Sequence, residues 1–168
     1  EWTPETAGFS FSSNSTTNEE SDWSSSGLFN NNKRMYIASS QMPQKTYVIP
    51  DSIEGWSDSL GVLLSAYFEN GEFPEYAGTE VVFDYSLIRP EGASLGSSSG
   101  KAPGAKPLMR ALEEIRTILN KCVKNGQTKM RPIGAYDGVM HASDAVLSGG
   151  VRRSATICLF SPDGMEMA

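Results

Sequence analysis

The 168-residue chain predicts an α/β protein of one domain, long enough to bury a real core. Short runs that are apolar, or that alternate apolar and polar residues, are typical of strands. Along the chain they alternate with longer runs whose apolar residues have helical spacing. In chain order the expected elements are a strand at 47–49, a helix at 52–68, a strand at 80–85, helices at 107–125 and 138–147, and a strand at 156–160. This order favours strands lying side by side in one sheet.

The first of these helices has a clear start signal. Pro50 keeps Ile49 out of the helical region, and Asp51 then offers an N-cap with Glu54 placed for a capping box. Apolar residues follow at helical spacing, namely Ile53, Trp56, Leu60, Leu63, Leu64 and Tyr67. Before this helix in the chain, apolar and polar residues alternate over 7–13, which predicts a short strand. The polar stretch 14–32 is predicted to be a loop or disordered.

The second clear strand is predicted to lead into a long loop. Val81, Phe83 and Tyr85 fall on one face of the strand. The segment 88–106 is rich in glycine and serine, and loops of this length are usually functional. Its run from Gly96 to Lys101 is not a P-loop, because Leu and Ala stand where glycine and the magnesium-binding hydroxyl are needed.

Two further helices are expected after this loop. Pro107 suits a first helical turn, Gly126 a C-terminal stop, and the apolar stripe between them comprises Leu108, Ala111, Leu112, Ile115, Leu119 and Cys122. Asp137 is predicted to cap the last helix, whose expected apolar face is Val139, Met140, Val146 and Leu147.

Charge and cysteine content limit the classes of function. The net charge is −6, yet most of the fourteen Lys and Arg residues lie between 101 and 153, which favours a local anionic ligand over nucleic acid. No apolar run is long enough for a membrane span. Two separated cysteines and one histidine predict neither a disulfide framework nor a metal site. A reducing, cytoplasmic location is expected.

The loop from Ser148 to Ala155 is the most suggestive segment. Gly149 and Gly150 would let a flat ligand approach the main chain, and Arg152 and Arg153 offer charged forks for phosphate or a base. A helix C-cap followed by two solvated arginines is the alternative.

Three blocks of sequence together resemble the large chain of ribonucleotide reductase, most closely its adenosylcobalamin-dependent class II type. They are Tyr47-Val-Ile-Pro-Asp-Ser-Ile-Glu-Gly-Trp56, Ile88-Arg-Pro-Glu-Gly-Ala93 and Ser148-Gly-Gly-Val-Arg-Arg-Ser-Ala155. The strand at 8–12 resembles a family strand more weakly. The resemblance implies part of a ten-stranded α/β barrel, a fragment of one five-stranded half, in which residues 47–168 belong to the barrel and 1–46 hold a weak strand and a polar loop.

The resemblance also implies two kinds of binding residue. A dNTP effector would be bordered by Asp51, Arg89, Gly92 and Ala93. The ribonucleotide substrate would be contacted by Gly149, Gly150, Arg152, Arg153, Ser154 and Ala155. The two glycines would let the loop 148–155 exchange between conformations, and each effector could then select one of them.

No residue matches the family's radical cysteine or its redox cysteines. The complete enzyme would use adenosylcobalamin and reduce ribonucleotides by radical chemistry, whereas this chain alone would bind no cofactor and be inactive. Its partners would be substrate, effector and the remainder of the reductase chain, with no nucleic acid or membrane. Two alternatives stay open: a non-catalytic nucleotide-binding or assembly module from a split or degenerate gene, and an unrelated nucleotide binder.

Overall fold

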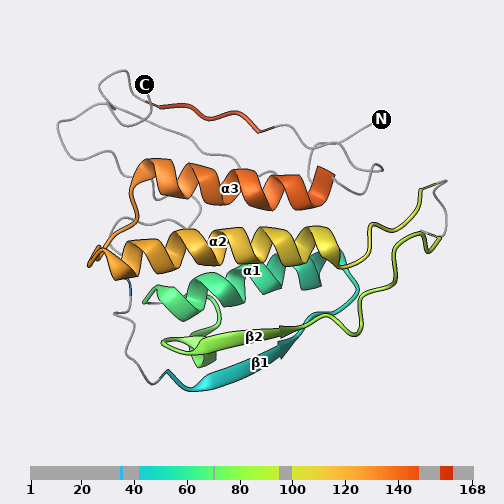
Figure 1. Ribbon diagram of the computed structural model, residues 1–168, viewed down its shortest axis with the longest axis horizontal. Coiled ribbons are helices and arrows are strands. Elements are labelled where there is room, and N and C mark those ends of the chain that lie inside the picture. The colour runs from blue at the N-terminus through green and yellow to red at the C-terminus, as the bar shows by residue number, and fades with distance from the viewer. Residues whose placement is uncertain (1–34, 36–41, 70, 95–99, 148–155, 161–168) are drawn as a thin grey trace.

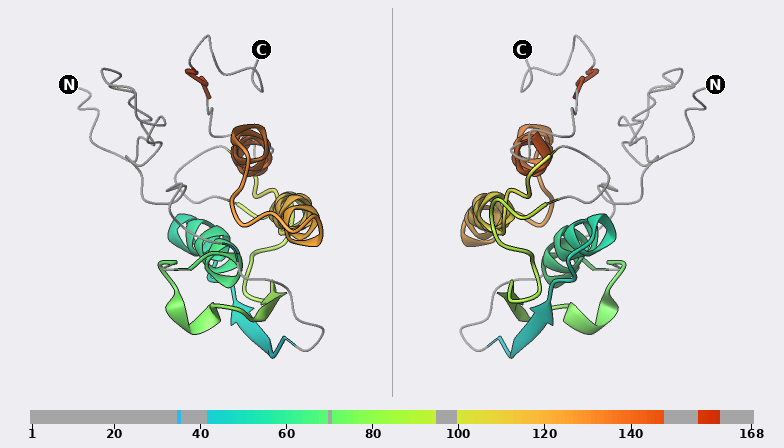
Figure 2. Two further views of the ribbon diagram at one scale, coloured as in Figure 1. Left: turned by 90° about the vertical axis from the view of Figure 1, so that its left-hand side faces the viewer. Right: turned by 90° about the vertical axis from the view of Figure 1, so that its right-hand side faces the viewer.

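The computed structural model describes residues 35, 42–69, 71–94, 100–147 and 156–160. Within them, two parallel strands and three long helices form a layered α/β unit (Figure 1). The helices α1 and α2 lie next to the sheet, and α3 packs on α2 on the side away from the strands (Figure 2). The predicted strand at 7–13 and loop at 14–32 lie outside the described residues.

The sheet consists of β1 (Gln44–Val48) and β2 (Glu80–Asp84), which pair in parallel with Tyr47 opposite Phe83. β1 begins three residues before the predicted segment 47–49 and ends one residue before its end, while β2 alternates as predicted. Val81 and the half-buried Tyr47 and Phe83 face inward, whereas Val48 and Val82 are exposed on the outer face. Because the chain returns through α1 to start the second strand beside the first, the unit is a β-α-β crossover.

Helix α1 (Ile53–Tyr67) confirms the first predicted helix but not its cap. Ser52 is the N-cap: its extended backbone lets its Oγ accept the Gly55 N–H at 3.0 Å. The predicted cap residue, Asp51, instead binds a residue far along the chain. Leu63 and Leu64 are buried as expected, while Ile53 is 56% exposed.

Helix α2 (Lys106–Lys124) confirms its predicted apolar stripe, since every member is buried. Its end is also as predicted: after the last turn, Gly126 donates its N–H to Val123 O at 2.9 Å and Gln127 to Cys122 O at 3.0 Å. The stripe packs against Ile49 and the leucines of α1, so the main core lies between the two helices and the sheet.

Helix α3 (Pro132–Leu147) begins earlier than predicted, and its apolar face differs. Pro132 occupies the first position, where its missing N–H costs nothing, so Asp137 lies inside the helix instead of capping it. Met140 and Val146 are exposed, while Ala145 is buried and Ala142 packs on the core. Small residues face α2 here, because they allow the two helices to pack closely.

The predicted strand at Thr156–Phe160 forms no ladder with any described residue. The segment is extended and exposed near α3, which it contacts through Ser143 and Thr156, whose hydroxyl oxygens lie 3.1 Å apart. Strand propensity alone cannot supply the neighbouring edge that a strand needs.

Candidate functional site

The candidate site lies where the two parallel strands end. Asp51 follows β1 by three residues, and Arg89 follows β2 by five. Arg89 Nε donates to Asp51 Oδ2 at 2.6 Å, which joins residues separated by 38 positions. Ligands of open α/β sheets bind outside the carboxyl ends of the strands, and this ion pair occupies that position.

The turn that holds Asp51 is built by close backbone packing. Ser52 N–H donates to Pro50 O at 2.9 Å, and the buried Gly55 sits against the same proline. A Cβ at Gly55 would lie 2.4 Å from Pro50 O, so only glycine allows this approach. Gly55 is therefore part of the site's scaffold, and sequence reasoning missed this role.

The loop after Arg89 is a hairpin with a hydrogen-bonded stem. Gly92 N–H donates to Ala102 O at 2.9 Å, and Ala102 N–H donates to Ala93 O at 2.8 Å, followed by a bridge between Ser94 and Lys101. The Ala93 N–H is also used, donating to Pro90 O at 3.2 Å. Gly92 and Ala93 thus shape the loop, and neither has its amide free for a ligand.

The ion pair remains accessible to a ligand. The Asp51 and Arg89 side chains keep 30% and 40% of their surface exposed, and Asp51 contacts only the inner guanidinium nitrogen of Arg89. The outer Nη groups of Arg89 have no partner among the described residues, so they can donate to an anion. Asp51 and Arg89 are brought together, with Gly92 close along the same loop.

The other predicted binding residues, Gly149, Gly150, Arg152, Arg153, Ser154 and Ala155, lie outside the described residues. The two cysteines are free thiols, and burial raises the pKa of Cys122. Within the described ranges no group of three or more His, Cys, Asp or Glu residues is arranged to hold a metal ion. No helix there has the length and apolar character to cross a membrane.

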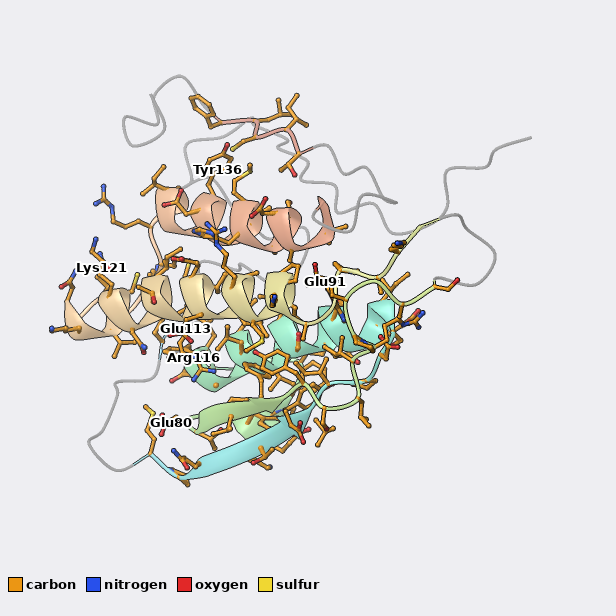
Figure 3. All side chains as sticks on the ribbon, turned by 45° about the vertical axis from the view of Figure 1, so that its right-hand side comes forward. Glu80, Glu91, Glu113, Arg116, Lys121 and Tyr136 are labelled. Atoms are coloured by element: carbon orange, nitrogen blue, oxygen red, sulfur yellow. The ribbon has the colours of Figure 1, made fainter. Side chains whose placement is uncertain are left out.

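A second feature is an open groove between β2 and α2, which sequence reasoning also missed. Figure 3 shows Glu113 and Arg116 of α2 beside β2, with Glu80 at the start of the strand. Arg116 Nη2 donates to Val81 O at 2.8 Å, and its guanidinium carbon lies 5.6 Å from the centre of the Phe83 ring. Burial raises the pKa of Tyr85 in this groove, and the nearby Arg116 charge partly opposes that rise.

The geometry defines a class: a parallel α/β unit with a charged, loop-bordered site at the carboxyl ends of its strands. The family model described as "B12-dependent ribonucleotide reductase, insertion domain" matches residues 11–119. The chain belongs to this family of B12-dependent ribonucleotide reductases.

Several named relatives agree. A probable adenosylcobalamin-dependent ribonucleoside-triphosphate reductase of Dictyostelium discoideum is 34% identical, over 71% of this chain and 14% of its own length. A putative enzyme of the same name in Mycobacterium phage D29 is 35% identical, over 67% of this chain and 17% of its own. The adenosylcobalamin-dependent ribonucleoside-triphosphate reductase of Lactobacillus helveticus is 36% identical, over 71% of this chain and 16% of its own length.

A crystal structure of a B12-dependent, class II ribonucleotide reductase matches with a TM-score of 0.53 and 29% identity. The matched region covers 63% of this chain and 14% of the chain in the crystal structure. The predicted resemblance is therefore confirmed. The chain spans less than a fifth of the length of the relatives and of this structure.

Proposed function

We propose that this chain is the allosteric-specificity part of a reductase that converts ribonucleotides to deoxyribonucleotides by radical chemistry. The family membership and the names of the relatives support this proposal. The chain would contribute the loops that bind an effector and the substrate base, while the radical and redox cysteines would come from the remainder of the reductase.

The effector part of the proposal is carried by the ion pair between Asp51 and Arg89. A dNTP combines a polyphosphate with a sugar hydroxyl, and the pair offers guanidinium donors without a partner among the described residues beside a carboxylate acceptor. The hairpin stem at Gly92 and Ala93 would form one wall of the site. Their amides are engaged within the loop, so their contribution would be shape and close approach rather than hydrogen bonds.

The substrate part rests on the arginine loop. Arg152 and Arg153, with Ser154 and Ala155, would contact the substrate base, and Gly149 and Gly150 would act as hinges that let each effector select a loop conformation. Its support is the match of Ser148-Gly-Gly-Val-Arg-Arg-Ser-Ala155 to the family pattern.

We also propose that the β-α-β unit is part of a ten-stranded α/β barrel. Parallel sheets occur almost only with both faces covered, and the outer face of this sheet exposes Val48 and Val82. A barrel would close the sheet and remove its free edges.

Adenosylcobalamin would be the cofactor of the complete enzyme, where it would supply the radical. The relatives are named for their dependence on it. The described residues do not form a fitting site, because the two thiols and the single histidine contribute to no common cluster. We assign none of its contacts and no reaction step to them.

The test is dNTP binding to the intact reductase, measured by equilibrium dialysis with each of the four dNTPs. Arg89→Gln removes a charge-assisted contact worth about 1.5–3 kcal/mol, so effector affinity should fall about ten- to a hundredfold. Asp51→Asn should weaken binding less, because the amide keeps an acceptor oxygen.

The matched control is Arg110→Gln, the same substitution at an exposed arginine of α2 that has no partner among the described residues. It should bind dNTPs as the wild type does. If Arg89→Gln and Arg110→Gln bind equally well, the ion pair does not border the effector.

A further inference from the structure

Asp84, the last residue of β2, forms hydrogen bonds through both its main chain and its side chain. Its main-chain oxygen accepts the Ile49 N–H at 2.9 Å, and its Oδ1 accepts the Ser86 N–H at 2.9 Å. The first bond continues the pairing with β1 one residue beyond Val48. The second closes an Asx turn, in which an aspartate accepts from the backbone two residues on. One residue therefore joins the end of β1 to the turn that follows β2.

The bond to Ile49 leads directly to Asp51. Ile49 is fully buried, so close packing holds it in place. Only Pro50 lies between Ile49 and Asp51, and its ring fixes one of its two backbone angles. The Pro50 oxygen accepts the Ser52 N–H at 2.9 Å, which closes the turn around Asp51. The main chain at Asp51 is thus held in place relative to Asp84.

The bond to Ser86 leads to Arg89 in the same way. Directly after the Asx turn, Ile88 N–H donates to Tyr85 O at 3.0 Å, as in a β-turn. Ile88 is buried in the main core, so the residue before Arg89 is anchored. The backbone of Arg89 is therefore placed by a short turn that starts at the end of β2.

We propose that the Asp84 carboxylate is the positioning residue of the effector site, since it fixes the turn that directs the Arg89 guanidinium toward Asp51 and a bound anion. Arg89 Nε donates to Asp51 Oδ2 at 2.6 Å, and this bond closes a circuit of hydrogen bonds that begins and ends at Asp84. Binding groups need such supporting contacts to keep a productive geometry. The inference rests on the proposed effector site, in which Asp84 would support the binding residues without contacting the dNTP.

The chemistry of Asp84 suits this role. Hydrogen bonds from Ser86, first that of its backbone N–H, lower the pKa of the Asp84 carboxyl below its usual value. The side chain is therefore a carboxylate at neutral pH, and both its oxygens act only as acceptors. Ser86 and Leu87 of the turn are exposed, so side-chain packing contributes little to its geometry. The acceptor at Asp84 is the feature that a substitution can remove.

The test is dNTP binding to the intact reductase, measured by equilibrium dialysis. Asp84→Ala removes the acceptor of the Asx turn, so dNTP affinity should fall about three- to tenfold. Asp84→Asn keeps a side-chain oxygen that can accept the Ser86 N–H, so its affinity should stay within about twofold of the wild type. Asp137→Ala, the same substitution at an exposed aspartate of α3, is the matched control and should bind as the wild type does. Equal affinities of Asp84→Ala and Asp137→Ala overturn the proposal.

A double-mutant cycle shows whether Asp84 acts through Arg89. In an Arg89→Gln background no guanidinium is left to position, so adding Asp84→Ala should cause no further loss of dNTP affinity. A further loss of the full size in that background overturns the proposal, because Asp84 would then affect binding by another route, such as a general loss of stability.

Hydrogen exchange of the ligand-free protein separates the positioning role from the effector site itself. The Ser86 amide should exchange faster in Asp84→Ala than in the wild type, and Asp84→Asn should restore its protection. An unchanged exchange rate in Asp84→Ala overturns the proposal. If the rate changes but Arg89→Gln binds dNTPs as tightly as Arg110→Gln, the effector site is wrong and the inference fails with it. If Arg89→Gln weakens binding and Asp84→Ala does not, the effector site stands and only the positioning role is wrong.

Discussion

Gly104 closes the base of the hairpin that carries the candidate effector residues. Its φ is +71°, and a Cβ there would lie 3.0 Å from the Glu91 backbone nitrogen. Both features disfavour a side chain: the first because L residues are strained in the left-handed region, the second because backbone atoms cannot easily move aside. A side chain at this position would therefore strain the stem of the hairpin.

Gly104→Ala should destabilise the protein more than Gly78→Ala does. Gly78 has a similar φ of +66°, but a Cβ there would meet no atom within 4 Å, so it reports the backbone strain alone. We expect about 1 kcal/mol for Gly78→Ala and about 2–3 kcal/mol for Gly104→Ala, measured by urea unfolding. Equal losses would show that the stem relaxes around the new methyl group.

Between elements, Arg116 is the polar link from α2 to the sheet. Its guanidinium donates to Val81 O and lies over the Phe83 ring, and its Nε is buried with Glu113 Oε2 at 3.9 Å. The side chain is only 20% exposed. A helix that otherwise packs through its apolar stripe thus gains a directional contact with β2, which helps to set its position along the strand.

Arg116→Met should cost about 1–3 kcal/mol of unfolding free energy, because Val81 O loses its donor while an unbranched apolar stem is retained. Arg110→Met on the same helix is the control, since Arg110 is exposed and should change stability by less than about 0.5 kcal/mol. Thermal and urea unfolding would compare them. Similar unfolding free energies for the two variants would mean that the contact of Arg116 with Val81 O does not stabilise the packing of α2 on β2.

For the whole molecule, stability should fall at alkaline pH. Burial raises the pKa of the Cys122 thiol and of the Tyr67 and Tyr85 phenols. Their unfolded values are about 8.5 for cysteine and 10 for tyrosine. Below these values the groups are neutral in both states. As pH rises past them the unfolded state ionises first, so stability is lost until the folded groups ionise as well.

The expected curve is flat between pH 7 and 8, declines from about pH 8.5 and falls more steeply near pH 10. Cys122→Ala should remove the first part of the decline and leave the tyrosine part. Urea unfolding at half-unit pH intervals measures both. A wild-type stability that is constant from pH 7 to 10.5 would contradict the burial of all three groups.

Local pattern was sufficient to predict most of the elements. The apolar stripe of α2, the Gly126 stop, the alternation of β2 and the existence of α1 all follow from spacing along the chain, and the structure confirms each. The same sequence blocks led to the reductase family, which the comparisons confirm. Periodicity works here because a helix or strand buries the face that its own residues define.

Long-range partners were decided only by the tertiary structure. Asp51 is of a residue type that is favoured at N-caps, but its carboxylate accepts a hydrogen bond from Arg89, and Ser52 is the N-cap instead. The reach of Arg116 to Val81, 35 residues away, depends likewise on a neighbour that no local pattern names. The preference of an aspartate for an N-cap position is worth about 1 kcal/mol. A hydrogen bond to a charged partner that the fold brings close is worth more, so it decides where the side chain points.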